Sequence, residues 1–259
     1  MRDFTLKLYE NLLTTLKLKG FIVQPIDNYQ NEQQNTIILR HDIDAKPYKA
    51  LSMALIEHKC DISSSFFFKI QPDILIPEIV QQIATLDHKI GYHYEDLVRN
   101  HGNYSKAISD FERNLDLMRK VVPVTSICAD GNPLSKYNNL WLWEKYDYRK
   151  FGIECEIYLD VDYNKIAYYT DTSRCWDGNK YNVWDHVNSE RAWPQYHSTF
   201  DIMHAINKGS FPVVSEINIH PQRWSDSYSE WLIELCTQNI KNIAKYIMVK
   251  RRENNRTHA

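Results

Sequence analysis

The sequence predicts a single-domain α/β protein in which about seven parallel strands form a distorted (β/α) barrel. Short apolar runs alternate with amphipathic segments along the chain, and this alternation favours a parallel sheet with right-handed crossovers. The 259 residues suffice for one large core, and no internal repeat or low-complexity segment divides them. A barrel leaves no strand edge exposed, which favours it over the alternative, an open doubly wound sheet.

The first half of the chain predicts one helix and then strands that alternate with helices. Charged residues interrupt the apolar ones over residues 4–19, which is typical of an amphipathic helix and not of a signal peptide. Residues 36–39 form a short, β-branched run followed by charge, as in a buried parallel strand. The further strands expected here are 62–70, 90–94 and 124–128, and the expected helices are 47–60, 77–86 and 105–121.

The second half begins with an irregular region, residues 130–197, that is rich in Asn, Asp, Tyr and Trp. Short strands are expected there at 156–159 and 166–169, among long loops. A helix at 199–207, a last strand at 211–219 and a long amphipathic helix at 227–250 complete the expected domain, residues 1–250. Residues 251–259 are polar and are expected to form a frayed tail.

Composition excludes several classes of protein. The net charge of −2 argues against a general nucleic-acid binder, and only 7 glycines with no glycine-rich motif argue against a phosphate-binding loop. The 17 Tyr and 7 Trp suit a cleft that stacks on sugar rings, although such residues also fill cores. Five scattered cysteines without a C-x-x-C predict free thiols in a reducing cytosol. With no apolar run long enough to span a membrane, we expect a soluble, cytoplasmic protein.

Titratable residues follow four of the expected strands. The strings are Arg40-His41-Asp42-Ile43-Asp44, Gly91-Tyr92-His93-Tyr94-Glu95-Asp96, Cys128-Ala129-Asp130-Gly131 and Asn218-Ile219-His220-Pro221. Ligand sites of parallel β/α folds lie at the carboxyl ends of the strands. Carboxylate and imidazole side chains gathered there indicate a metal site, for zinc or for iron, cobalt, nickel or manganese.

Asp42 and Asp44 point the same way if the strand is regular, and two adjacent carboxylates require a cation or a proton between them. One of the two can bind a metal while the other takes a proton from the metal-bound water. The structural alternative is that they cap the helix that starts near Pro47. His93 and His220 have a comparable alternative as hydrogen-bonded core residues.

These strings resemble the NodB-type polysaccharide deacetylases, the metal-dependent carbohydrate esterases of family four. Asp42-Ile43-Asp44 is similar to the first family motif, and Ile217-Asn218-Ile219-His220 to the last. Gly91-Tyr92-His93 matches the start of Gly-x-His-x-x-x-His, but Leu97 stands where the second His belongs. The strings RHDID, GYHYED, TDTSRCWDG and HPQRW also resemble a branch of this superfamily found among polysaccharide-biosynthesis proteins.

The resemblance implies a distorted β/α barrel that binds a divalent transition metal, with zinc as the expected ion. It implies that Asp42 is the general base, that Asp44 and His93 are metal ligands, and that His220 is the acid. Because Leu97 replaces a ligand, another residue must complete the metal shell. Asp130 is the first candidate, followed by Glu95 and His41.

The resemblance also gives the irregular region a role. Asp171 is expected to orient the catalytic groups. Arg174 can bind an anionic group of an activated sugar or can form a buried pair with Asp171, while Arg40 and Arg223 could complete an anion site. Trp176 and Trp224 can stack on sugar or pack in the core.

The predicted function is that of a metal-dependent hydrolase that removes an N- or O-acyl group, acetyl or formyl, from a sugar. The substrate expected is a nucleotide-linked or lipid-linked intermediate of polysaccharide biosynthesis. One alternative is a non-catalytic carbohydrate-binding descendant, which Leu97 favours. Another is a metal-dependent hydrolase of a non-sugar amide. The sequence leaves the oligomeric state open.

Overall fold

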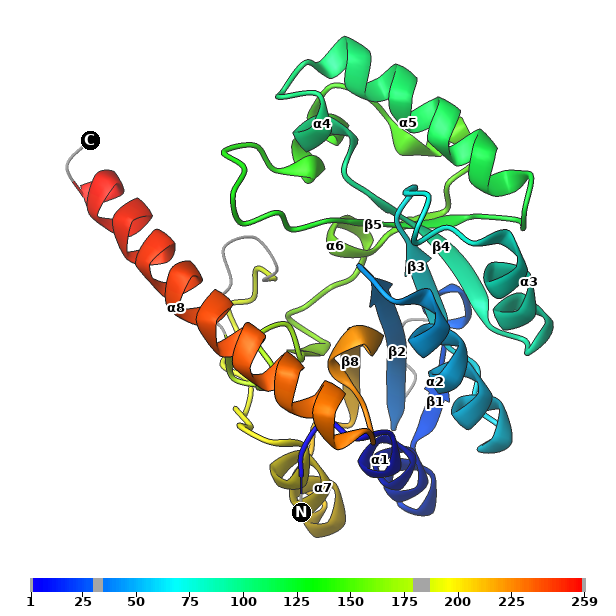
Figure 1. The fold of residues 1–259 in the computed structure, drawn as a ribbon, viewed down its shortest axis with the longest axis vertical. Coiled ribbons are helices and arrows are strands. Elements are labelled where there is room, and N and C mark those ends of the chain that lie inside the picture. The colour runs from blue at the N-terminus through cyan, green and yellow to red at the C-terminus, as the bar shows by residue number, and fades with distance from the viewer. Residues whose placement is uncertain (1, 30–34, 179–186, 258–259) are drawn as a thin grey trace.

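The computed structural model describes residues 2–29, 35–178 and 187–257. Its eight strands form one parallel sheet in the order β6-β5-β4-β3-β2-β8-β7, and β1 pairs with β2 outside this path. The strands are β1 (Ile22–Gln24), β2 (Thr36–Ile43), β3 (Ser65–Phe68), β4 (Lys89–Tyr94), β5 (Ser126–Ala129), β6 (Cys155–Glu156), β7 (Ala167–Thr170) and β8 (Val214–Ile219). The sheet is curled (Figure 1). Within the described residues its end strands β6 and β7 do not pair, so it forms a half-barrel. The predicted α/β class with about seven parallel strands is confirmed.

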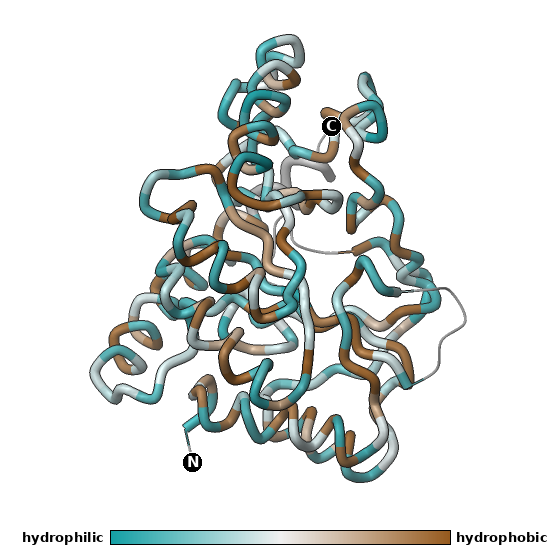
Figure 2. The backbone as a smooth tube through the Cα atoms, turned by 90° about the vertical axis from the view of Figure 1, so that its right-hand side faces the viewer, coloured by the Kyte–Doolittle hydropathy of each residue, from teal (hydrophilic) through white to brown (hydrophobic). Residues whose placement is uncertain are grey.

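The longer helices begin and end close to the predicted positions, except that the last one continues beyond its predicted end. They are α1 (Leu6–Leu18), α2 (Pro47–Lys59), α3 (Pro77–Thr85), α5 (Tyr104–Arg119), α7 (Thr199–Lys208) and α8 (Tyr228–Thr257). Local chemistry fixes several of their ends: Thr5 caps α1, and Ser198 and Asp201 form a capping box at α7. The helices alternate between hydrophobic and hydrophilic segments along their length, as amphipathic helices do (Figure 2).

Three apolar clusters divide the core according to the alternation of side chains along the strands. Ile37 and Leu39 of β2 pack outward with α1 and α7, and Ile43 packs outward with α2 and α3. Ile38 points inward, where it packs with residues of β3 and β5, Phe67 and Cys128. Successive side chains of a strand lie on opposite faces, so Arg40 and Asp42 share the inner face with Ile38. The inner face of the half-barrel therefore carries charged as well as apolar side chains.

The structure differs from the prediction in the irregular region. Residues 156–159 were expected to form a strand, but only Cys155 and Glu156 are extended and the helix α6 (Ile157–Asp160) follows at once. The cause is local, because the Glu156 carboxylate accepts a hydrogen bond from the backbone N–H of Leu159 and caps the helix. The strand β1 and the short helix α4 (Asp96–Arg99) were also not predicted.

The last helix differs in length and in orientation. α8 continues to Thr257, so the expected separate tail from residue 251 is not present, and its C-terminal end stands clear of the sheet (Figure 1). Its polar residues Gln238 and Asn242 are buried, whereas Ile233, Ile240 and Ile243 are 64–70% exposed. The helix thus turns its hydrophilic side toward the rest of the protein. Among the described residues no helix is long and apolar enough to cross a membrane.

Candidate active site

A cleft of about 490 Å³ lies at the carboxyl ends of the strands. Five residues that line or support it come immediately after the last residue of a strand: Asp44, Lys69, Asp130, Asp171 and His220. His93 lies near the end of β4. On another side α8 contributes polar residues, among them Glu234, Gln238, Lys241 and Lys245. The cleft is therefore where parallel β/α folds place their ligands.

Asp44, His93 and Asp130 form the candidate metal centre. Their ligand atoms all lie within 4.8 Å of one another. Nε2 of His93 is 3.7 Å from Oδ1 of Asp44 and 3.6 Å from Oδ1 of Asp130. One imidazole and two carboxylates suit zinc and other divalent transition metals. The structure thus brings together the two ligands implied by the resemblance and the first candidate for the third.

The orientation of His93 supports this assignment. Its Nδ1 lies 3.0 Å from the carbonyl oxygen of Cys128, which can only accept a hydrogen bond. Nδ1 therefore carries a proton, and Nε2 is the ring nitrogen that faces Asp44 and Asp130 and is available to a metal. Metal-binding histidines are commonly held by such a bond from the other ring nitrogen. The donor set accordingly fits a divalent cation.

Lys69, which the sequence analysis did not single out, lies between the two carboxylates. Its Nζ is 2.7 Å from Oδ1 of Asp44 and 2.8 Å from Oδ1 of Asp130. Burial by itself would raise the pKa of Asp44, but the charges of Lys69, His220 and His93 hold it well below its usual range. Burial opposes the charge of Lys69, but the two carboxylates raise the pKa of its ammonium, which stays charged. Lys69 follows β3 directly, so its position at a strand end could have marked it.

A second group of possible ligands consists of Asp42, His93 and Cys128. Metal binding by a cysteine requires the thiolate. Burial raises the pKa of the Cys128 thiol well above its ordinary value, despite the nearby charge of Arg40. Its sulfur lies 2.8 Å from Nη1 of Arg40 and does not line the cleft. Asp44, His93 and Asp130 are therefore the better ligand set.

Asp42 stands beside this centre and is held from one side. Its Oδ2 accepts a hydrogen bond of 2.9 Å from Nδ2 of Asn218 and lies 3.6 Å from Nη2 of Arg40. Its Oδ1 is buried without a hydrogen-bond partner among the described residues, although Asp42 lines the cleft. A carboxylate fixed through one oxygen and free at the other is suited to accept a proton. Neither Asp42 nor Asp44 caps α2, whose N-cap residue is Lys46 without a side-chain cap.

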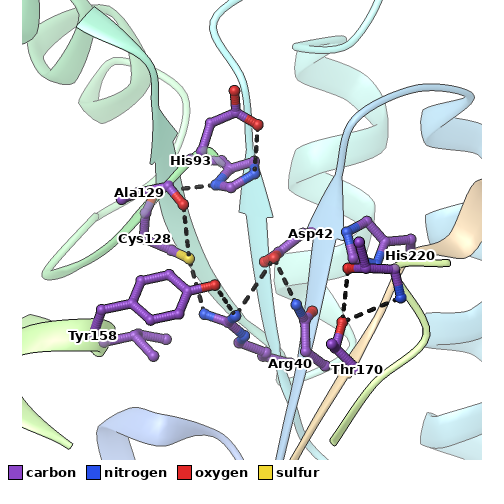
Figure 3. Close-up of polar contacts among 12 residues, drawn as sticks. Arg40, Asp42, His93, Cys128, Ala129, Tyr158, Thr170 and His220 are labelled. Atoms are coloured by element: carbon purple, nitrogen blue, oxygen red, sulfur yellow. Dashed lines mark hydrogen bonds and ion pairs between the residues drawn. The ribbon is translucent and has the colours of Figure 1, made fainter. Parts of the chain in front are cut away.

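Arg40 supports Asp42 from below and was wrongly expected to bind substrate. It is fully buried, and Figure 3 shows its contacts with Asp42, Cys128 and Tyr158. Its Nε lies 2.9 Å from the buried Glu216 carboxylate. The Arg40 guanidinium is thus bound by protein groups and does not line the cleft. Its role is to orient Asp42 and not to bind a ligand.

His220 lies on the other side of Asp44, with its Nε2 3.7 Å from Oδ2 of Asp44. Its Nδ1 is 2.7 Å from Oδ1 of Asp171, which is fully buried and also accepts a bond of 2.7 Å from the indole N–H of Trp224. Asp171 therefore orients His220, as the resemblance implies. Trp224 is fully buried and hydrogen-bonds to this carboxylate. Of the two alternatives for Trp224, packing in the core is therefore found and stacking on a sugar is not.

Arg174 and Trp176 also lie away from the cleft. The Arg174 guanidinium stacks on the rings of Phe4 and Trp231, and burial lowers its pKa. It does not form the expected side-chain pair with Asp171, and only a backbone hydrogen bond joins the two residues. Trp176 is 3% exposed and donates its indole N–H to Thr199. Both residues brace the loop after β7, so the predicted substrate contacts are replaced by packing.

The remaining candidates have other partners. His41 points to the outer face, where it pairs with the buried Glu57 at 2.8 Å. Glu95 lines the cleft, but its carboxylate accepts a hydrogen bond from Gln71 and forms an ion pair with Arg99. Leu97, at the place of the family histidine, is fully buried in the core. Arg223 donates to the backbone carbonyl of Asp171.

Comparison with known proteins adds a structural likeness. No family model matches the chain, and no curated protein matches it in sequence. Its structure matches a mutant of the peptidoglycan deacetylase PdaC from Bacillus subtilis, with 12% sequence identity and a TM-score of 0.44. The match covers 89% of this chain and 98% of that one.

Proposed function

We propose that the protein is a metal-dependent hydrolase that removes an acetyl or formyl group from an amino or hydroxyl group of a sugar. One arrangement carries this proposal: Asp44 lies between the ligand atom of His93 and the Asp171-bound His220. A ligand set and a proton donor thus face the same cleft, with the free oxygen of Asp42 beside them. The motif resemblance supports the choice of acyl transfer to water.

Asp44, His93 and Asp130 would hold the metal, which when bound lowers the pKa of water and polarises a carbonyl oxygen. Asp42 accepts the proton of the attacking water at Oδ1, because Asn218 and Arg40 hold its other oxygen. His220 gives its Nε2 proton to the departing amine or alkoxide, while Asp171 keeps the Nδ1 proton in place.

The lining of the cleft supports a polar substrate. Lys46, Lys241 and Lys245 line it together with the carboxylates, whereas the tryptophans expected to stack on sugar are buried. Recognition would therefore depend on hydrogen bonds and charge. We infer that the sugar carries an anionic group, as nucleotide-linked and lipid-linked precursors do.

The test is to incubate the full chain with Zn²⁺ or Co²⁺ and acylated amino sugars, free and linked to a nucleoside diphosphate, and to measure acetate or formate. Release that is lost in Asp44→Ala and in His220→Ala supports the proposal. Release only from acylated non-sugar amines would identify an amidase of another substrate class. Binding of the sugar without release, under all metal conditions, would indicate the non-catalytic alternative.

A further inference from the structure

The ammonium of Lys69 occupies the position that a bound cation would take. It contacts Oδ1 of both Asp44 and Asp130, at 2.7 and 2.8 Å. The same two oxygen atoms face Nε2 of His93 at 3.7 and 3.6 Å. Lys69 and the candidate metal therefore depend on the same pair of carboxylate oxygens.

Charge makes the two occupants mutually exclusive. An ammonium and a divalent ion on the same oxygen atoms would repel each other strongly in a site with little access to water. The side chains of Lys69 and Asp130 are each 12% exposed and that of Asp44 is 29% exposed, so solvent screens this repulsion only in part. Without either cation, the two carboxylates would in turn repel each other.

We propose that Lys69 is the resident counter-ion of the site, and that a divalent metal binds only when the Lys69 ammonium leaves Asp44 and Asp130. This inference rests on the proposed function, because it takes these residues as the metal ligands. Lys69 then sets the metal affinity without being a ligand. The apparent association constant of the metal is the intrinsic one multiplied by the fraction of molecules in which the carboxylates are free of the ammonium.

Lys69 lines the cleft, so its ammonium has space to move into, and its side chain carries no other ion pair among the described residues. Its aliphatic stem is flexible, as lysine side chains are. Displaced, the ammonium stays in the cleft and adds a positive charge to the wall that already carries Lys46, Lys241 and Lys245.

The experiment measures Zn²⁺ and Co²⁺ binding to the metal-stripped full chain by calorimetry, and by Co²⁺ absorption spectra, for wild type and Lys69→Met. We expect at least tenfold tighter binding in Lys69→Met. Lys46→Met is the matched control: Lys46 lines the same cleft, but in the described part of the chain its ammonium pairs with neither carboxylate. The metal affinity of Lys46→Met should stay within threefold of the metal affinity of wild type.

Thermal unfolding without metal provides the second readout. Lys69→Met should unfold at a lower temperature than Lys46→Met, and metal should raise its unfolding temperature more than that of wild type. One result would overturn the inference and leave the proposed function standing: wild type binds metal, Asp44→Ala does not, and Lys69→Met binds metal no more tightly than wild type. If neither protein binds metal, both fail. Tighter binding in Lys69→Met without deacylation overturns the proposed function alone.

Discussion

Nδ1 of His220 lies 2.7 Å from Oδ1 of Asp171, and the second oxygen of Asp171 accepts the indole N–H of Trp224 at 2.7 Å. Asp171 also accepts the backbone N–H of His220 at 3.0 Å. Ring and backbone of His220 are therefore fixed by one buried carboxylate, which in turn is fixed by the core. Nε2 of His220 consequently has one orientation, toward Asp44 and the cleft.

Replacing Asp171 with Asn should lower turnover in the deacylation assay by about 10²–10⁴-fold with little change in metal affinity. Asn offers an N–H to His220 and thereby favours the wrong tautomer. The check has two parts, kinetics and ¹⁵N NMR of the His220 ring, where the protonated nitrogen should change. A kinetic loss with an unchanged tautomer would contradict this role for Asp171.

The Asp42→Asn variant should keep its metal but lose about 10²–10⁴-fold in turnover, because the amide cannot accept a proton. Asn218 and Arg40 should still orient the side-chain oxygen. Metal content and kinetics are measured on the same preparation. A variant that also loses its metal would show that Asp42, His93 and Cys128 form the metal site instead.

Asp130 should prove to be the third metal ligand. The Asp130→Ala variant should bind Zn²⁺ at least tenfold more weakly than wild type, as titration of the metal-stripped protein can show. Glu95→Gln is the control, since Glu95 lines the same cleft but is bound to Gln71 and Arg99. Equal losses in both variants would mean that the charge of the cleft matters and not ligation by Asp130.

Glu156 should make the stability of the protein depend on pH. Burial raises its pKa from 4.5 to about 8, although bonds from Tyr94 and from the Ala129 and Leu159 N–H groups oppose the shift. A raised folded-state pKa gives stability that is complete below about pH 4.5 and is lost as pH rises through about 8.

Relative to wild type, Glu156→Gln should therefore gain stability as pH rises, by about 1 kcal/mol per pH unit between pH 5 and 7. Urea unfolding of both proteins at several pH values gives this difference. The loss of the bond to Leu159 shifts the whole curve of the variant but not its slope. Parallel curves would show that Glu156 is ionised in the folded protein at neutral pH.

Gly91 should be required for packing inside the half-barrel. A Cβ at this position would overlap the ring of Phe67 and lie 3.0 Å from the carbonyl oxygen of Ser126. Gly91→Ala should destabilise the protein by about 1–3 kcal/mol in urea unfolding. Phe67→Leu in the same background should recover part of this loss, and a failure to recover any would point to the backbone contact.

Much of the site could be predicted because strand ends are readable in the sequence. Asp44, His93, Asp130 and His220 all follow or end apolar runs, and parallel strands bring their carboxyl ends together. The same rule covers Lys69, but an ammonium cannot bind a metal, so the ligand chemistry of the strand ends did not indicate it. The alternation of a strand also excludes His41, since it must face away from Asp42.

Whether a side chain is buried was harder to predict from the sequence than where it lies along a strand. Trp176 and Trp224 have the aromatic surface that a sugar site needs, but here they fill the core around the loop after β7. A single sequence does not tell whether a tryptophan near a strand end packs inward or faces the cleft, because both environments favour it. The helix α6 was missed for a similar reason, since its cap depends on one side-chain bond of Glu156.

Because α8 turns its hydrophilic side toward the rest of the protein, the wall of the cleft that it forms is built independently of the apolar core. The reacting groups are fixed by the sheet, whereas one wall of the cleft belongs to a helix whose buried residues Gln238 and Asn242 are polar. Asn242 donates to the carbonyl of Ser173, and beyond such bonds this helix contributes little to the apolar core. Substitutions of the exposed residues in this wall should therefore change what the cleft binds without disturbing the half-barrel or the groups that the sheet fixes.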